Sequence, residues 1–401
     1  MNFKKIIAAV ISASMVLAGF AGCSDTASNA ETTVQASESA AAAAENATEE
    51  AEADVTAQKE TSSEEATRTI VDHTGAEVTL PAEIDRVVIA SLWPLPSIYC
   101  LFKGSADDLV GMHPGSMSAA QNSYLINVFP ELEEVDTSFV VNGEMNIEQL
   151  LALEPDVVFY SAGNTEEREK YDAAGIPAVG FSTAIADFDC VETYAEWIDL
   201  LGDIYGDSER ANTIIEAGRE TAAEIKAIVD TIPEEDKPSV LMLYQYSDGI
   251  IQTSGTGFFG HYWIESAGGK NAAGELKSTP EINMEQIYEW DPDIIFITNF
   301  SPYLPEDFYS NSIEGHDWSN VSAVKNGKVY KFPLGMYRWF PPSSDAPLSL
   351  MWLAQKIQPE LFEYIDMDTE IRSYFEEYYG VTLTDDDIQK IYNPAREAAG
   401  E

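Results

Sequence analysis

The stretch that decides the fold is NIEQLLALEPDVVFY, residues 146–160, which returns as NMEQIYEWDPDIIFI at residues 283–297. Solenoid repeats follow one another at periods of roughly 20 to 50 residues, and these two copies lie too far apart for that. In each copy an Asn can cap a short helix, a Pro ends it, and the apolar run after the Pro predicts a buried strand. We therefore expect two similar halves, each of which uses this segment once.

Apolar runs alternate with helical patterns around both copies. The first half has a hairpin pattern in TRTIVDHTGAEVTL, and then strand patterns in RVVIAS, DLVGM, PDVVFY and PAVGF. The second half has strand patterns in SVLMLYQYS, PDIIFIT and GKVYKFP, before helical patterns in SSDAPLSLMWLAQKIQPELF and DTEIRSYFEEYYG. Continuous apolar runs between helices are typical of parallel sheets covered on both faces.

A single long helix is predicted between the halves. It begins near Ser208, keeps its apolar residues on one face, and runs for about 24 residues until Pro233 ends it. The expected fold class is α/β, with two parallel-sheet lobes joined by this helix and a ligand cleft between them. The expected boundaries are 1–22 for a signal peptide, 23–66 for a tether, 67–206 for the N-terminal lobe, 207–232 for the interlobe helix and 233–401 for the C-terminal lobe.

The amino terminus has the pattern of a secretory signal. Two lysines precede an apolar run that is slightly short for a membrane span of about 20 residues, and small residues lead to Cys23. The segment FAGC, residues 20–23, resembles the lipobox of bacterial lipoproteins, which implies lipidation of Cys23; an uncleaved signal anchor is the alternative. The Ala, Glu, Ser and Thr composition that follows predicts a disordered acidic tether, so we expect a protein anchored by lipid at the outer face of the cell membrane, on the periplasmic side in a diderm.

The net charge limits the possible partners, and the cysteines limit the possible disulfide bonds. The 22 Lys and Arg residues face 69 Asp and Glu residues, a net charge of −47, which excludes nucleic acid as a partner and indicates a solvated acidic surface. Cys100 and Cys190 lie in apolar helical contexts. They predict two buried thiols, with a disulfide as the open alternative in a secreted protein.

Six segments, taken in order, resemble one family: the solute-binding proteins of ABC importers for ferric siderophores, haem and cobalamin. These segments are DHTGAEVTLP followed by RVV, NIEQLLALEPDVVF, ESAGGKNAA, NMEQIYEWDPDIIF, WSNVSAVKNGKVYKFP and DAPLSLMWLAQKIQPELF. The resemblance implies two α/β lobes on a long helix, no intrinsic cofactor, and an ABC permease with its ATPase as partners of a monomer. It also implies that Glu148 and Glu285, one in each repeated segment, dock against arginines of the permease. The simpler interpretation of both acids is that they stabilise helix starts.

Ligand contacts are expected beyond the carboxyl ends of the strands, where open α/β sheets bind ligands. The candidates there, rich in aromatic side chains, are Trp93, His113, Tyr244, Tyr246, His261, Arg338 and Trp339, with Leu92, Met112, Tyr160, Asn299, Phe300 and Tyr337 beside them.

Each of these residues has a functional and a structural interpretation. Arg338 suits an anionic group on a ligand, or an ion pair with one of the many acids. His113 and His261, from opposite lobes, suit contact with a metal-bearing ligand across the cleft, or are ordinary loop residues. Tyr244 and Tyr246 alternate on a strand, so we expect both on one face, either against a planar ligand or packed in the core.

Three classes of function are compatible with a secreted two-lobed protein. An enzyme is disfavoured because the chain has no GxSxG, no HExxH and no Gly-rich phosphate loop. A sensor or adhesin would not need two docking acids. The favoured function is capture of a small-molecule iron complex, with a ferric siderophore as first choice and haem, a corrinoid or an oxyanion such as molybdate as alternatives.

Overall fold

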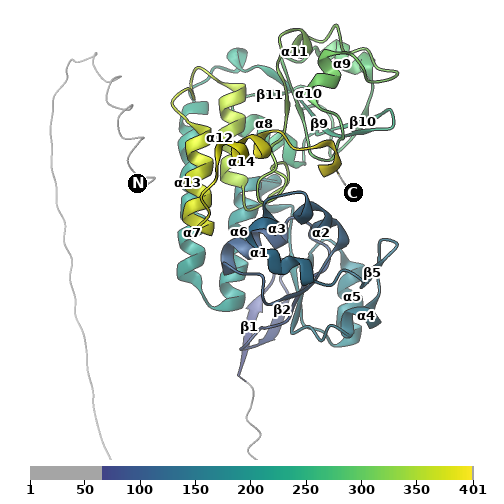
Figure 1. The fold of residues 1–401 in the computed structure, drawn as a ribbon, viewed down its shortest axis with the longest axis vertical. Helices are drawn as coiled ribbons and strands as arrows, with labels where there is room; N and C mark the ends of the chain where they lie inside the picture. Colours follow the sequence, from purple (N-terminus) through teal and green to yellow (C-terminus); the bar gives the residue numbers. More distant parts are fainter. Residues whose placement is uncertain (1–65, 400–401) are drawn as a thin grey trace, which may run out of the picture. The chain divides into compact units, whose positions relative to one another are not determined.

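The computed structural model describes residues 66–399, which form two lobes side by side (Figure 1). The predicted signal peptide, the lipidation site at Cys23 and the tether up to residue 65 lie outside the described residues. No helix within residues 66–399 is long and apolar enough to cross a membrane.

The first lobe is built on a four-stranded parallel sheet in the order β4-β3-β7-β8. An antiparallel hairpin of β1 and β2 precedes it, as the sequence predicts. The strands are β1 (Thr67–Val71), β2 (Glu77–Pro81), β3 (Val87–Ile89), β4 (Leu109–Met112), β5 (Val140–Val141), β6 (Glu144–Met145), β7 (Val157–Ser161) and β8 (Ala178–Phe181). The helices are α1 (Leu95–Lys103), α2 (Pro114–Gln121), α3 (Leu125–Val128), α4 (Ile147–Leu151) and α5 (Thr165–Ala174).

The second lobe has a mixed sheet in the order β12-β10-β9-β13-β14, with β11 also paired to β9. The predicted parallel strands β9, β13 and β14 form its core, and β10 and β12 extend it as antiparallel strands. The strands are β9 (Ser239–Ser247), β10 (Ile250–Thr253), β11 (Lys270–Asn271), β12 (Glu281–Ile282), β13 (Ile294–Ile297) and β14 (Val329–Lys331). The helices are α8 (Phe259–Ser266), α9 (Met284–Trp290), α10 (Pro305–Tyr309) and α11 (Ser322–Lys325).

The lobes are connected by more than the one helix predicted. The long helix is α7 (Ser208–Val229), whose first turn is capped by the side chain of Asp207. Beside it runs α6 (Cys190–Tyr205), which packs against α1 of the first lobe and against α8 of the second. The remaining helices are α12 (Ala346–Ile357), α13 (Met367–Tyr379) and α14 (Asp385–Tyr392). In Figure 1, α6, α7, α12 and α13 lie together on one side of the two lobes.

The hydrophobic core is shared between the lobes. One cluster of buried residues extends from Ile70 in the first lobe to Ile391 in α14, and it includes Cys100 and Cys190. Both cysteines are free and buried, so the prediction of two buried thiols is confirmed. The outer face of each sheet has a smaller cluster of its own. A shared core of this kind couples the stability of the two lobes.

The repeated segment does the same structural work in both lobes. The aspartate after its proline bonds to backbone N–H groups that lead into the neighbouring central strand. In the first lobe, Asp156 accepts from the N–H groups of Asp85 and Arg86, each at 2.9 Å, just before β3. In the second, Asp293 accepts from the N–H of Ser239 at 2.9 Å, where β9 begins. The Pro-Asp pair therefore joins two adjacent strands in each lobe, which explains why the fold uses the segment twice.

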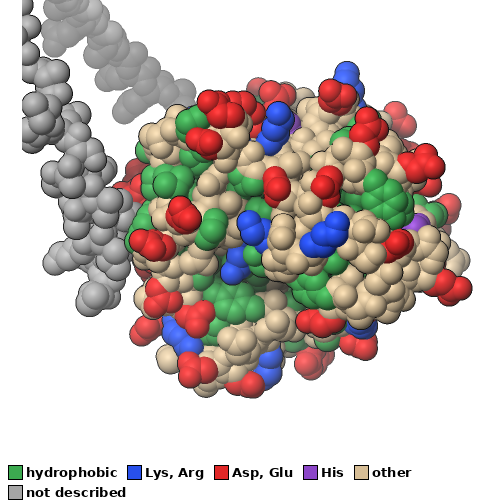
Figure 2. Space-filling view, turned by 90° about the horizontal axis from the view of Figure 1, so that it is seen from above, with side chains coloured by type: hydrophobic (Ala, Val, Ile, Leu, Met, Phe, Trp, Pro, Cys, Tyr) green, Lys and Arg blue, Asp and Glu red, His purple; other side chains and the backbone are tan. Residues whose placement is uncertain are grey.

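The acidic surplus is distributed over the surface. Figure 2 shows acidic side chains spread across one face of the molecule with a few basic ones among them, rather than gathered in a single patch. This distribution agrees with a solvated acidic surface.

Candidate ligand-binding cleft

The two lobes meet at the carboxyl ends of their sheets. The segment after α2 reaches the segment after β14: the N–H of Tyr124 donates to the carbonyl of Gly335 at 2.8 Å, and the hydroxyl of Ser123 donates to the carbonyl of Met336 at 3.1 Å. Ligands of open α/β sheets bind at this edge. The loops that follow the strands of both lobes therefore line the region between them.

On the first lobe this edge carries Trp93 and His113. Their rings are stacked, with centroids 5.2 Å apart and an angle of 25° between the planes. The N–H of Gly115 donates to Nδ1 of His113 at 2.9 Å, which holds the imidazole at the start of α2. A Cβ at Gly115 would lie 2.7 Å from the indole of Trp93, so only glycine allows this approach.

The hydrogen bond from Gly115 determines what His113 can do. Burial lowers the pKa of His113, which favours the neutral ring. Because Nδ1 accepts, the proton of the neutral ring is on Nε2, which is then a donor. If His113 bound a metal through Nε2, its proton would have to be on Nδ1. It would then point at the N–H of Gly115, and the hydrogen bond between them would be lost. His113 is thus better suited to donate to an anionic oxygen than to bind a metal ion.

An aromatic wall forms at the same edge, with most of its members on the second lobe; we use this name for Phe188, Tyr244, Phe258 and Phe300, which are all partly exposed. Tyr244 lies 4.9 Å from Phe258 and 5.5 Å from Phe300 between ring centroids, both edge to face. Phe188 comes from the loop before α6 and lies 6.3 Å from Phe258. The wall therefore has members from both sides of the lobe boundary, and it offers an apolar surface for planar groups.

Arg338 lies behind this wall. Its guanidinium carbon is 4.5 Å from the centroid of the Phe300 ring, and the side chain is buried at 1% exposure. Its Nη2 also donates to the carbonyl of Ala398 at 3.4 Å. Burial lowers its pKa, but a guanidinium keeps its charge in proteins, and this charge opposes the burial-driven rise in the pKa of Tyr244. The charge of Arg338 therefore produces a positive electrostatic potential at the aromatic wall in front of it.

A buried lysine, which the sequence patterns did not single out, holds the loop that carries Phe300. The ammonium of Lys331, on β14, donates to the carbonyls of Thr298 at 2.9 Å and Tyr303 at 3.2 Å, and to the carbonyl of Ser301. Three carbonyls converging on one ammonium satisfy its three donors. The position of Phe300 therefore depends on Lys331.

Tyr246 does not share a face with Tyr244, and that expectation is wrong. Tyr246 pairs with Ile251 of β10, but the register shifts within the pair, so that Thr253 faces Leu243 and one residue of β9 is left out of the ladder. This bulge reverses the alternation of side chains. Tyr246 is fully buried in the outer core cluster, where Trp318 Nε1 donates to its hydroxyl at 3.2 Å.

Two further candidates are turned away from the wall. The Nδ1 of His261 lies 3.3 Å from Nδ2 of Asn271, and Asn271 pairs with Val240 near the amino end of β9, opposite the cleft edge. The expected meeting of His261 with His113 across the cleft is therefore not seen. Trp339 is fully buried, with its ring 6.3 Å from Trp352 of α12.

Glu148 and Glu285 occupy equivalent, exposed positions. Each lies in the first turn of its short helix, α4 or α9, and neither has an ion-pair partner among residues 66–399. The caps are the predicted asparagines: Asn146 accepts from the N–H of Glu148 at 3.0 Å, and Asn283 accepts from the N–H of Gln286 at 3.0 Å. In Figure 1, α4 and α9 lie on the same side of the molecule, one in each lobe. Both carboxylates are therefore open to solvent.

The described residues contain no group of three or more His, Cys, Asp or Glu side chains placed to hold a metal ion.

Comparison with known proteins gives consistent matches. The model of the family described as "Periplasmic binding protein" matches residues 100–334. A periplasmic solute-binding protein from Veillonella parvula is 34% identical with a TM-score of 0.74, and the match covers 82% of this chain and 97% of that structure. The molybdate-binding protein MolA of Haemophilus influenzae is 25% identical over 81% of this chain and 94% of its own length. The Fe(3+)-citrate-binding protein YfmC of Bacillus subtilis is 25% identical over 48% of this chain, which spans 58% of that relative.

Proposed function

The chain belongs to the periplasmic binding protein family, the solute-binding proteins of ABC importers, and from this premise we propose that it captures an anionic iron complex and delivers it to a permease. It is a transport protein and not an enzyme, and it has no cofactor of its own. The observation that carries the choice of ligand is the position of Arg338 behind Phe300 in the aromatic wall.

An organic chelate of iron with a net negative charge fits the three properties of the cleft. Its carbon framework would pack against the partly exposed rings of Tyr244, Phe258 and Phe300, because aromatic surfaces favour contact with apolar groups over water. Its carboxylate or catecholate oxygens would face the potential of Arg338 and the Nε2 donor of His113. A ferric siderophore or a ferric carboxylate complex has this composition, and the relative named for Fe(3+)-citrate binding supports the same class.

Molybdate is the second candidate because the similarity between this chain and MolA covers 94% of the length of MolA. A tetrahedral oxyanion needs several hydrogen-bond donors close together and gains little from aromatic surfaces. The partly exposed aromatic wall favours the larger organic complex. Haem and corrinoids remain alternatives with larger planar surfaces.

Thermal-shift and absorbance screening of the purified protein tests this choice. The probes are ferric citrate, ferric siderophores of carboxylate and catecholate type, haem, cobalamin and molybdate. We expect a rise in melting temperature with a ferric complex and a smaller rise in Tyr244→Leu. If only molybdate or cobalamin raises the melting temperature, the iron assignment is wrong while the transport role stands.

We further propose that Glu148 and Glu285 dock the loaded protein on the permease. Bidentate contacts between carboxylates and arginines give both attraction and geometry. The double variant Glu148→Lys with Glu285→Lys should abolish uptake and keep ligand affinity. The matched control reverses two other exposed acids, Glu169→Lys with Glu275→Lys, and should leave uptake intact; normal uptake in the first variant would exclude the docking role.

The cellular location is part of the same proposal. We infer a monomer tethered through lipidated Cys23 at the outer face of the cell membrane, the periplasmic side in a diderm. Metabolic labelling with a fatty acid should mark the protein, and Cys23→Ala should lose the label and release the protein from membranes. Retention of the variant in the membrane fraction would indicate an uncleaved signal anchor instead.

A further inference from the structure

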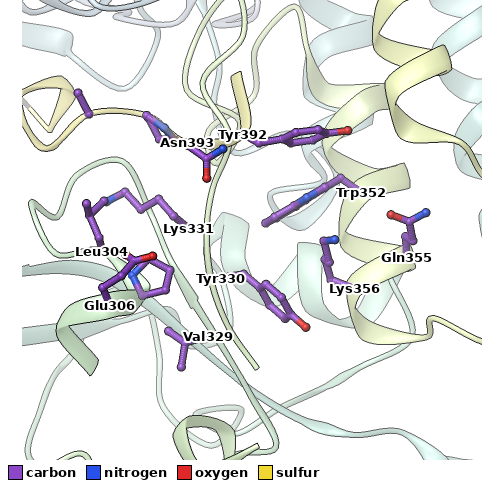
Figure 3. Close-up of a pocket in the computed structure, with 13 residues that line it drawn as sticks. Leu304, Glu306, Val329, Tyr330, Lys331, Trp352, Gln355, Lys356, Tyr392 and Asn393 are labelled. Atoms are coloured by element: carbon purple, nitrogen blue, oxygen red, sulfur yellow. The ribbon is translucent and has the colours of Figure 1, made fainter. Parts of the chain in front are cut away.

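A cavity of about 560 Å³ lies on the second lobe, formed by segments other than the aromatic wall (Figure 3). Three segments enclose it: β14, the second half of α12, and residues 392–395 at the end of α14, with residues 304–306 at its rim. Ligand cavities in proteins commonly measure roughly 300 to 1,000 Å³. The space is therefore large enough for a small molecule, and the transport role does not use it.

Two lysines line this cavity, in a chain dominated by acids. Among the lysines in the described part of the chain, Lys331 and Lys356 alone are shielded from water without an ion pair to a carboxylate. The amine of Lys331 is occupied by three carbonyls and burial lowers its pKa to about 7, so it offers a ligand no free donor. The side chain of Lys356 enters from α12, on the opposite side of the cavity (Figure 3).

Lys356 is held in an unusual environment for a lysine on an acidic protein. Its ammonium lies 5.6 Å from the centroid of the Tyr330 ring, and burial lowers its pKa. An ammonium that is partly removed from water loses part of its hydration free energy, and Lys356 has no carboxylate partner within residues 66–399 that compensates for this loss. A ligand anion in the cavity could compensate for it.

Three aromatic side chains, Tyr330, Trp352 and Tyr392, also line the cavity, and contacts with their neighbours hold Trp352 and Tyr392 in position. Trp352 packs with its ring 5.4 Å from Phe296 and 5.5 Å from Phe332, and the hydroxyl of Tyr392 donates to Asp368 at 3.0 Å. Trp352, Tyr330 and Tyr392 surround the space into which Lys356 extends (Figure 3). Rigid aromatic surfaces around one cation are suited to a flat anion.

We propose that this cavity is a second ligand site, which binds a planar aromatic anion through Lys356 and stacks its ring system among Tyr330, Trp352 and Tyr392. The exposed carboxylate of Glu306 at the rim disfavours a second negative charge at the outer end of the ligand. A monoanion such as an aromatic carboxylate meets both conditions.

Calorimetric titration of the full-length protein with 2-naphthoate tests the proposal, with the neutral 2-naphthamide as a matched probe. We expect 2-naphthoate to bind at least about tenfold more tightly than 2-naphthamide, since a hydrogen bond between charged groups contributes more than one to a neutral amide. Lys356→Met keeps the aliphatic stem and should weaken 2-naphthoate binding about tenfold or more. The control Lys277→Met, at an exposed lysine, should leave it unchanged.

A cleft variant separates this site from the aromatic wall. Tyr244→Leu should not change the affinity for 2-naphthoate, whereas it weakens binding of the transported iron complex. Loss of 2-naphthoate binding in Tyr244→Leu with normal binding in Lys356→Met would place the probe in the cleft and overturn the proposal. Equal affinity for the acid and the amide, or absence of binding by the native protein, would overturn it as well. The transport role is unaffected by any of these outcomes.

Discussion

The hydroxyl of Tyr124 donates a 2.7 Å hydrogen bond to the carboxylate of Asp387, and this bond joins the first lobe to α14. The hydroxyl and the N–H of Thr384, at the cap of α14, also donate to Asp387; these two bonds, followed by the one from Tyr124, lower its pKa to about 2. The bond lies beside two others to the loop after β14, from the hydroxyl of Ser123 to Met336 and from the N–H of Tyr124 to Gly335, so it belongs to the junction of the two lobes.

Loss of this bond should weaken the junction by a small, measurable amount. Tyr124→Phe is expected to lower the free energy of unfolding by about 1 kcal/mol near neutral pH, the usual contribution of one hydrogen bond. Because the folded pKa of Asp387 is depressed, its contribution is present above about pH 4 and is lost as the pH falls toward 2. The difference between wild type and Tyr124→Phe in urea unfolding should therefore shrink over that range, while Tyr364→Phe, at an exposed tyrosine, should show no such trend.

Asp345 should give stability the opposite pH dependence. The side chain is fully buried before α12, and its Oδ2 accepts from the N–H of Tyr337 at 3.1 Å. Burial raises its pKa to about 7, so the folded state holds a proton that the unfolded state releases above about pH 4. The stabilisation is complete below about pH 4 and is lost as the pH rises through 7.

The variant Asp345→Asn tests this sign, because an amide keeps an acceptor for Tyr337 and does not titrate. The stability of wild type relative to Asp345→Asn should increase as the pH falls from about 7 to about 4, measured by melting temperature in matched buffers. A difference that is constant with pH would show that Asp345 is ionised in the folded protein.

The two tyrosines of β9 should separate binding from stability. Tyr244→Leu is expected to reduce affinity for the iron complex and to leave the melting temperature nearly unchanged, because the side chain is partly exposed in the aromatic wall. Tyr246→Phe should do the reverse, at a cost of roughly 1 to 2 kcal/mol, since Trp318 loses the acceptor for its buried N–H. Reduced affinity in Tyr246→Phe at full stability would contradict the placement of the bulge.

Lys331→Met should damage the cleft without touching the aromatic wall directly. The methionine leaves the carbonyls of Thr298, Ser301 and Tyr303 without their shared donor, which is expected to destabilise the protein by roughly 2 to 3 kcal/mol. The loop carrying Phe300 should become mobile, with weaker ligand binding and faster hydrogen exchange over 298–303. Lys328→Met, at an exposed lysine nearby, serves as the control.

Much of the architecture follows from the sequence because buried parallel strands have a distinct composition. The strands β3, β7 and β13 are recognisable as apolar, β-branched runs and β9 as a long apolar one, and the repeated segment predicts both short helices and their caps. The sequence does not identify α6 as a second connection between the lobes. An amphipathic pattern shows that one face of a helix is buried, but it does not show which lobe covers that face.

The site was predicted less well, for a physical reason in each case. The alternation of Tyr244 and Tyr246 assumes a regular ladder, and one bulge in β9 reverses it. Trp339 follows a strand and is nevertheless fully buried, with its ring 6.3 Å from that of Trp352 in α12. Lys331 reads as an ordinary strand-end lysine in the sequence. Its three carbonyl partners come from a loop about thirty residues earlier, a distance at which no local pattern carries information.

The aspartates of the repeated segment have a consequence for how a permease would sense this protein. Asp156 and Asp293 follow α4 and α9 in the chain, and their hydrogen bonds fasten each repeated segment to the central strands of its own lobe, which end at the cleft. Because α6 and α7 run along both lobes and the core is shared, a wide swing of one lobe against the other is disfavoured. A permease that contacts Glu148 and Glu285 at the same time would therefore respond to the distance between the two lobes. A shift of about an ångström at the strand ends would change the separation of the two carboxylates that the permease contacts.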